Sequence, residues 1–146
     1  MTNISIYSRA SDTKSTKTIP LDLFFEGIRD GKWQDIVLPI RTVTDKEARQ
    51  EAKKKAPAVT IAGQFKERSD SGLEKHSGFL AIDIDDVSDG NNGTDELNHL
   101  KSLICADKYV YAAFVSISGR GLCVVLKINP AKHREAFQGA SEYFYD

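Results

Sequence analysis

The sequence predicts an α+β fold, because segments with the two-residue periodicity of strands and segments with helical periodicity both occur along the chain. From Phe79 onward their order is strand, helix, strand, strand, helix, which is a ferredoxin-like split βαβ arrangement (βαββα) without its final strand. The preceding residues predict shorter strands and charged helices. We therefore expect a single domain over residues 1–146, in which a smaller α/β portion at 1–75 precedes the core at 76–146.

The N-terminal portion is expected to contain short elements that end at strong breakers. A first helix starts around Thr18 and Pro20, which are typical of an opening helical turn. A second helix is capped by Thr44 or Asp45 and is ended by Pro57. The expected elements are a strand at 4–8, a loop to 17, a helix from 18 to 30, an ambiguous stretch at 34–41, a helix to 56, a strand at 58–65 and a charged loop at 67–75.

The core begins with an expected strand at 79–87, in which Leu80, Ile82 and Ile84 share one face that would be buried. The elements that follow are a turn-rich loop at 89–93, a helix from 94, a strand at 109–117, a tight turn at 118–121, a strand at 122–128 and a helix that opens at 129. A fourth strand would come from downstream sequence or be replaced by an N-terminal strand. We therefore expect the chain to be the N-terminal part of a longer polypeptide.

Composition excludes some classes of protein. The chain has 146 residues, of which 28% are charged, and its formal net charge is −1. This balance argues against a protein whose whole surface follows nucleic acid, although it leaves room for a local basic patch. The helix that carries Lys53, Lys54 and Lys55 is interpreted as a solvated surface, with phosphate contact as the alternative.

The two cysteines and the first residues bear on location. Cys105 and Cys123 lie in apolar runs and are expected to be buried free thiols of an intracellular protein. Residues 1–20 contain no signal-peptide core, and no apolar run approaches the roughly 20 residues that a membrane helix requires. The expected location is the cytoplasm.

Asp83 and Asp85 are the strongest functional signal in the chain. They stand at positions i and i+2 of a hydrophobic strand, so their carboxyl groups share the face opposite Leu80 and Ile82 and start roughly 7 Å apart. Two carboxylates so placed can converge on one divalent cation, as in enzymes that hold Mg²⁺ or Mn²⁺ against a triphosphate. Asp86 has the parity of the buried face and is interpreted as a strand-end residue that does not contact the metal.

The turn at residues 118–121 is the second signal. In a split βαβ fold it lies next to the strand that carries the two aspartates. Gly119 and Gly121 can present backbone N–H groups to phosphate oxygens, Ser118 adds a hydroxyl donor, and Arg120 supplies a planar cationic fork. Each motif alone also fits a plain structural role, as a strand-end acid pair or a simple hairpin, but together they predict a nucleoside triphosphate site.

The chain resembles a known family at these residues. Asp83-Ile-Asp85 and Ser116-Ile-Ser-Gly-Arg-Gly-Leu122, with Ala58-Val-Thr-Ile-Ala-Gly-Gln-Phe65 and His76-Ser-Gly78 upstream, are similar to the primase-like N-terminal domain of VirE-type (virulence-associated protein E) mobile-element proteins. That group belongs to the primase-polymerase branch of the archaeo-eukaryotic primase superfamily. The resemblance extends over nearly the whole chain, from the segment at 53–57 to the last helix at 133–137.

The resemblance implies a palm with an RNA-recognition-motif-like core. It also implies metal-dependent nucleotidyl transfer on a DNA template, which we expect to be single-stranded. Asp83 and Asp85 would be the catalytic and metal-binding residues, with Mg²⁺ or Mn²⁺ as cofactor. Ser118, Gly119, Arg120 and Gly121 would bind the nucleotide phosphates. It also implies a downstream helicase-like or VirE-type domain in the parent protein, which would act in DNA replication of a mobile element.

The chain departs from the family pattern at two places. Many members of the superfamily carry a histidine on the strand after the glycine loop, whereas this chain has Cys123. The third acidic motif of the family would fall on the next strand, beyond Asp146. An isolated domain of this kind could bind nucleotide without turning it over.

Two other functions compete with an enzyme of this class. A degenerate palm could recognise single-stranded DNA or a replication partner without doing chemistry, and Tyr109 and Tyr111 could then stack on bases. Asp-x-Asp also holds the metal of nucleotide-sugar enzymes, although the chain is short for their usual fold. His76 and Trp33 are interpreted as structural residues, with roles at the site as the alternatives.

Overall fold

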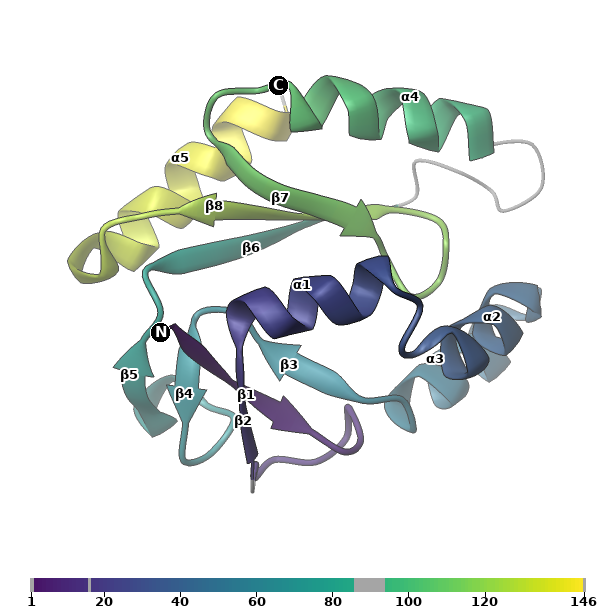
Figure 1. The fold of residues 1–146 in the computed structure, drawn as a ribbon, viewed down its shortest axis with the longest axis horizontal. Helices are drawn as coiled ribbons and strands as arrows, with labels where there is room; N and C mark the ends of the chain where they lie inside the picture. Colours follow the sequence, from purple (N-terminus) through teal and green to yellow (C-terminus); the bar gives the residue numbers. More distant parts are fainter. Residues whose placement is uncertain (1, 16, 86–93, 146) are drawn as a thin grey trace. The chain divides into compact units, whose positions relative to one another are not determined.

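The structure is a computed structural model that describes residues 2–15, 17–85 and 94–145. Within these ranges it is a mixed α+β protein with antiparallel sheets and five α-helices, and it divides into two compact units, residues 1–77 and 78–146 (Figure 1). This boundary lies two residues beyond the one expected between the N-terminal portion and the core. None of the helices in the described ranges combines the length and apolar character that crossing a bilayer requires.

The first unit contains a three-stranded antiparallel sheet in the order β2-β1-β3 and a separate β-hairpin. Its sheet strands are β1 (Asn3–Tyr7), β2 (Lys17–Pro20) and β3 (Ala58–Thr60), and its hairpin strands are β4 (Gly63–Phe65) and β5 (Leu73–His76). Its helices are α1 (Leu21–Arg29), α2 (Gln34–Thr42) and α3 (Lys46–Lys54). The buried Ser5 hydroxyl accepts a hydrogen bond of 2.9 Å from the Phe65 N–H, which ties the hairpin to β1.

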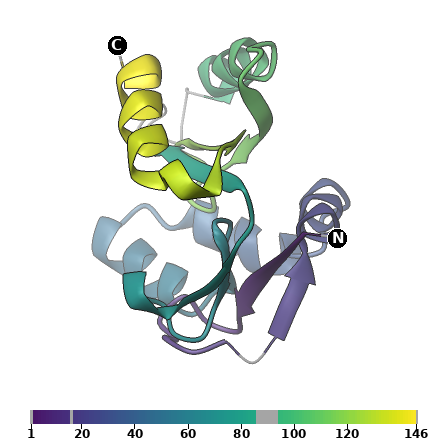
Figure 2. The ribbon, with the colours of Figure 1, turned by 90° about the vertical axis from the view of Figure 1, so that its left-hand side faces the viewer.

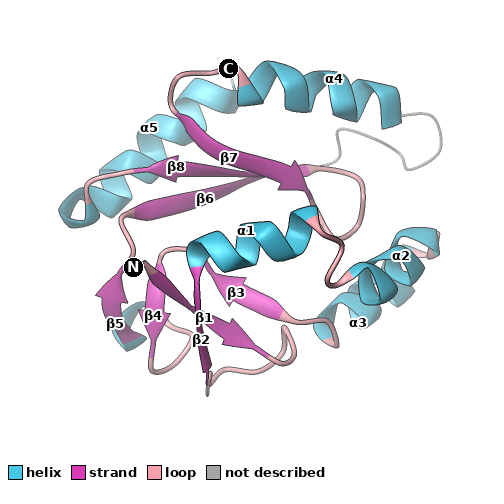
Figure 3. Cartoon of the chain, in the orientation of Figure 1, coloured by secondary structure: helices cyan, strands magenta, loops and turns pink. Residues whose placement is uncertain are grey.

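The second unit is built in the order strand, helix, strand, strand, helix. Its elements are β6 (Phe79–Ile84), α4 (Thr94–Cys105), β7 (Val110–Val115), β8 (Leu122–Lys127) and α5 (His133–Tyr145). The strands form an antiparallel sheet in the order β6-β8-β7, and both helices lie on the same face of it (Figures 2 and 3).

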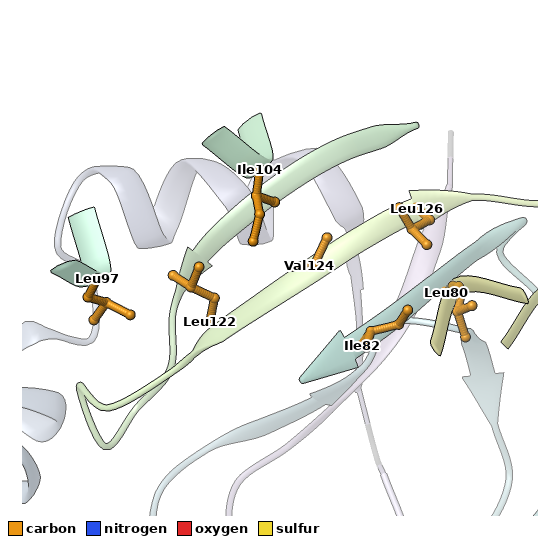
Figure 4. Packing of buried hydrophobic residues seen from close by; sticks show 8 residues of the cluster. Leu80, Ile82, Leu97, Ile104, Leu122, Val124 and Leu126 are labelled. Carbon is orange, nitrogen blue, oxygen red and sulfur yellow. The ribbon is translucent and has the colours of Figure 1, made fainter. Parts of the chain in front are cut away.

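The core of this unit lies between the sheet and the two helices. Alternate residues of β6 and β8 point toward the helices, where Leu97 and Ile104 of α4 and Ala140 of α5 meet them. The cluster is shown in Figure 4 and consists of Leu80, Ile82, Leu97, Ile104, Leu122, Val124, Leu126 and Ala140. Val124 is completely buried, so a truncation there would cost about 1–3 kcal/mol through lost burial and the cavity left behind. Because side chains alternate along a strand, the residues of β6 and β8 that lie between these core residues point to the opposite face of the sheet.

Several expected boundaries are wrong, each for a local reason. Thr18 and Pro20 lie in β2, because β1 offers its edge for pairing. Pro20 has an extended conformation and is also the N-cap of α1, so the expected helix begins at Leu21 rather than at 18. The expected strand at 58–65 is divided into β3 and β4 by a turn before Gly63, whose added Cβ would lie 2.1 Å from the Lys75 carbonyl oxygen.

Three further expectations have clear outcomes. The ambiguous stretch at 34–41 is helical, and the expected charged loop at 67–75 contains β5, whose sequence Leu-Glu-Lys-His lacks the alternation typical of a strand. Asp45 caps α3, since its Oδ2 accepts a 2.8 Å hydrogen bond from the Ala48 N–H. Both cysteines are free thiols, but Cys105 is exposed rather than buried.

Candidate functional site

Asp83 and Asp85 lie on the face of β6 that the helices do not cover. Asp83 is in the strand and Asp85 directly follows it, and both side chains are exposed. Their neighbours of opposite parity, Ile82 and Ile84, pack in the core or against it. The alternation of the strand therefore directs both carboxylates to one side, as expected, whereas Asp86 lies outside the described residues.

Cys123 is the immediate neighbour of Asp83 across the sheet. β6 pairs with β8 so that Asp83 stands opposite Cys123, and β7 places Phe114 on the other side of the same cysteine. Burial, and then the negative charge of Asp83, raise the pKa of the Cys123 thiol to about 12. Cys123 is therefore a neutral thiol at physiological pH, so its side chain adds no charge beside the acids.

The turn between β7 and β8 is held together by its own hydrogen bonds. The Ser116 N–H donates to the Gly121 carbonyl over 2.9 Å, and the Gly119 N–H donates to the Ser116 carbonyl over 2.9 Å. Gly119 has a φ of 76°, a left-handed conformation that glycine adopts without a steric penalty. The turn is thus a closed hairpin whose backbone geometry depends on this glycine.

Two serine side chains complete this closure. Ser116 Oγ lies 3.2 Å from Ser118 Oγ and accepts the Gly121 N–H over 3.2 Å, while Ser118 Oγ accepts the Arg120 N–H over 3.3 Å. Both bonds to N–H groups are long for hydrogen bonds of this type, so an anion could replace them at little cost. Ser116 is a site residue that the sequence interpretation left without a role, although the spacing Ser-x-Ser-Gly could have indicated it.

Gly121 brings this turn against the strand that carries the acids. A Cβ on Gly121 would lie 2.1 Å from the Ile84 carbonyl oxygen and 3.2 Å from the Asp85 Cα. Only a residue without a side chain permits this approach of two backbones. The four nucleotide-binding residues expected at 118–121 and the acid pair are therefore neighbours, as the sequence predicts.

The backbone N–H groups of the turn are engaged in the described conformation. The N–H groups of Gly119, Arg120 and Gly121 donate to the Ser116 carbonyl, Ser118 Oγ and Ser116 Oγ respectively. A phosphate would thus contact these amides only after the serine bonds open. An anion would gain hydrogen bonds most directly from the half-buried Arg120 side chain and from the Ser118 hydroxyl.

The residues present fit a divalent cation that shares its ligands with a phosphate. Two carboxylates with water and substrate oxygens are a usual environment for Mg²⁺, and Cys123, as a neutral thiol, is a poor ligand for this hard ion. Among the residues that the structure describes, no group of three or more histidine, cysteine, aspartate or glutamate side chains is placed to hold a metal ion. Asp83 and Asp85 are the two carboxylates that this strand could offer to a cation.

The other residues that the sequence analysis considered for the site take part in strand pairing or in packing of aromatic rings. His76 ends β5, where it pairs with Gly63, and Trp33 packs on Phe24 with their ring centroids 5.6 Å apart. Tyr109 meets Tyr143 of α5 on the helix-covered side, whereas Tyr111 meets Phe79 on the opposite face. The two tyrosines thus do not form one stacking platform, because a β-bulge at Tyr111 interrupts the alternation.

The second unit is an α+β domain in which an antiparallel sheet carries paired aspartates beside a serine- and glycine-rich hairpin. A family model described as BT4734-like, N-terminal domain, matches residues 51–145, and the chain therefore belongs to the BT4734-like N-terminal domain family. The matched segment begins in α3 and includes both acids and the whole turn. No curated protein and no solved structure matches the chain.

Proposed function

We propose that this chain is the DNA primase/polymerase-like nucleotidyltransferase domain of a mobile-element replication protein, and that it acts in the cytoplasm. The observation that carries this proposal is the close approach of Gly121 to Ile84, because it brings the serine- and glycine-rich turn beside two exposed carboxylates. The resemblance to VirE-type proteins that the sequence of Asp83-Ile-Asp85 and of the turn suggests points to the same function. The proposed ligands are a nucleoside triphosphate and a single-stranded DNA template.

Each residue has a distinct part in this proposal. Asp83 and Asp85 would hold Mg²⁺ or Mn²⁺, which supplies Lewis-acid stabilisation of the triphosphate and of the attacking 3′-hydroxyl when it is bound. Arg120 and Ser118 would contact the phosphate oxygens first. The amides of Gly119 and Gly121 would then exchange their serine partners for phosphate oxygens.

The fold of the second unit supports the same proposal. The unit has a βαββα order, the strand order β6-β8-β7 and both helices on one face, and we propose that it is an RNA-recognition-motif-like, ferredoxin-like palm. We propose that a helicase-like or VirE-type module of the parent protein acts together with this domain.

A catalytically inactive palm that binds DNA or a protein partner is the second candidate. It is favoured by the turn, whose N–H groups are already engaged by Ser116 and Ser118. It is also favoured by the presence of only two carboxylates on the described face of β6. Metal-dependent nucleotide binding separates the two functions, since the inactive module has no need of it.

The test is calorimetric titration of a deoxynucleoside triphosphate into the protein with and without Mn²⁺. The proposed enzyme binds only with the metal, and the Asp83→Asn, Asp85→Asn double variant loses at least about tenfold in affinity, or about 1.4 kcal/mol. Asp107→Asn is the matched control, because Asp107 is a carboxylate of the same unit that hydrogen-bonds Tyr143 instead. Equal nucleotide affinity of the wild type and the double variant would show that the two acids do not take part in the site, and would refute the proposal.

A further inference from the structure

Charge is distributed unevenly between the two units. Residues 1–77 contain 14 lysines and arginines against 11 aspartates and glutamates, whereas residues 78–146 contain 6 against 10. The unit that carries Asp83 and Asp85 is therefore negative overall, with the first unit positive. A polyanion that binds this protein would find its favourable charges on the first unit.

Five exposed positive charges of the first unit lie on three segments that meet. We name as the basic surface the side chains of Arg9, Lys14, Lys54, Lys55 and Arg68, all of which are exposed. They come from the loop after β1, from the end of α3 and from the turn between β4 and β5. Figure 1 shows the loop after β1 beside the connection from α3 to β3.

Backbone hydrogen bonds hold these three segments together. The Ala10 N–H donates to the Ala56 carbonyl over 2.7 Å, and the Ser11 N–H donates to the Lys54 carbonyl over 3.2 Å. The Arg68 N–H donates to the Thr13 carbonyl over 2.7 Å. The cations of the basic surface are thus presented by a connected framework rather than by independent loops.

Arg68 is further fixed by its own side chain. Its guanidinium lies 5.3 Å from the centroid of the buried Tyr7 ring, and its Nη1 donates to the Ala10 carbonyl. A guanidinium held in this way contributes its charge without much further loss of rotamer freedom on binding.

Acidic side chains reduce this charge only in part. Glu51 pairs with Lys54 over 2.9 Å and Asp12 accepts the Arg9 N–H over 3.2 Å. Glu67 and Asp70 lie on either side of Arg68 in its turn. Both partners of the Glu51–Lys54 pair are well exposed, and such pairs contribute little to stability. Lys54 can therefore exchange its carboxylate for a phosphate oxygen at small cost.

We propose that the basic surface binds the sugar–phosphate backbone of the DNA strand, without regard to its sequence. The choice of DNA among polyanions rests on the proposed function, whereas the location rests on the charges and contacts of the first unit. Lysines and arginines that neutralise phosphates release counterions, which makes the affinity depend on salt. Contacts from all five side chains give a slope of log K against log salt of about −3.5 for a single strand.

The experiment measures fluorescence anisotropy of a labelled single-stranded oligonucleotide between low and moderate salt. Its variant is the Arg9→Gln, Lys54→Gln, Lys55→Gln triple change, which keeps Arg68 because that side chain also supports the loop. The control is the Lys46→Gln, Lys75→Gln, Lys132→Gln change, which removes three exposed charges elsewhere. The triple variant should bind at least about tenfold more weakly with a slope reduced by about 2, while the control stays near wild type.

Three results would overturn the proposal. The first is that the wild-type protein binds no oligonucleotide. The second is that the triple variant binds the oligonucleotide as tightly as the control variant does. The third is that a polyglutamate chain of equal charge displaces the labelled oligonucleotide as well as unlabelled DNA does. Manganese-dependent nucleotide binding is measured on the same variants. Nucleotide binding that survives without DNA binding refutes the basic surface alone, and DNA binding without nucleotide binding refutes the nucleotidyltransferase alone.

Discussion

Replacement of Gly121 by alanine tests the packing that joins the turn to the acid strand. The new Cβ would lie 2.1 Å from the Ile84 carbonyl oxygen, about 1 Å closer than a Cβ tolerates, and the obstructing atom is backbone. The φ of Gly121 lies outside the left-handed region, so the cost comes from the collision alone. Overpacking of this kind costs about 1–3 kcal/mol, and we expect a loss of that size in the free energy of unfolding.

Urea denaturation followed by circular dichroism measures this loss, with Gly139→Ala as the control. Gly139 lies in α5 with nothing within 4 Å of an added Cβ, so alanine there should stabilise the helix by about 0.5–1 kcal/mol. The Gly121 variant should also weaken metal-dependent nucleotide binding, because the turn must move away from Asp85. A Gly121→Ala protein as stable as wild type, with unchanged nucleotide affinity, would refute this account of the contact.

Three further predictions concern single side chains. The pKa of Asp107 is lowered in the folded state by hydrogen bonds from the Tyr143 hydroxyl, over 2.6 Å, and from the Tyr109 N–H. The ionised carboxylate therefore stabilises the fold at pH values above the ordinary pKa of aspartate. This stabilisation is lost as the pH falls through the lowered pKa of the folded state. Tyr143→Phe should therefore flatten the dependence of the urea midpoint on pH between about 2 and 5. At pH 8, iodoacetamide should label the exposed Cys105 and leave Cys123, whose pKa is about 12, unlabelled by mass spectrometry. Ser116→Ala should tighten Mn²⁺-dependent nucleotide binding in calorimetry, because the Gly121 N–H then has no serine bond to give up before it contacts phosphate.

Each of these has an outcome that contradicts it. An acid slope unchanged in Tyr143→Phe would mean that the hydroxyl does not lower the pKa of Asp107. Equal labelling of both cysteines would show that the β8 thiol is accessible and reactive. Weaker nucleotide binding in Ser116→Ala would show that the serine prepares the turn for phosphate rather than competing with it.

The sequence predicted the second unit well because its periodicities are strong. Alternation in β6 separates Leu80 and Ile82 from Asp83, and this pattern alone orients the acids. The short elements of the first unit were harder to predict. β2 and β5 exist because they have partners in β1 and β4, and local propensity carries no information on such long-range pairing.

The candidate site was predictable in its residue types and not in its internal contacts. The proximity of the acids to the turn follows from the strand order, which the βαββα pattern implies. The closure of the turn by Ser116 depends on side-chain rotamers, and the raised pKa of Cys123 depends on burial and on the register with Asp83. No pattern in the sequence sets either of these quantities.

The central claim is that Asp83 and Asp85 bind a metal ion beside the turn at residues 118–121. Paramagnetic broadening of backbone amide signals by substoichiometric Mn²⁺ in ¹⁵N-labelled protein tests it most directly. We predict that the signals of residues 83–85 and 118–121 broaden first, and that the Asp83→Asn, Asp85→Asn variant abolishes this broadening. Broadening that centres on other residues, or that persists in the double variant, would contradict the claim.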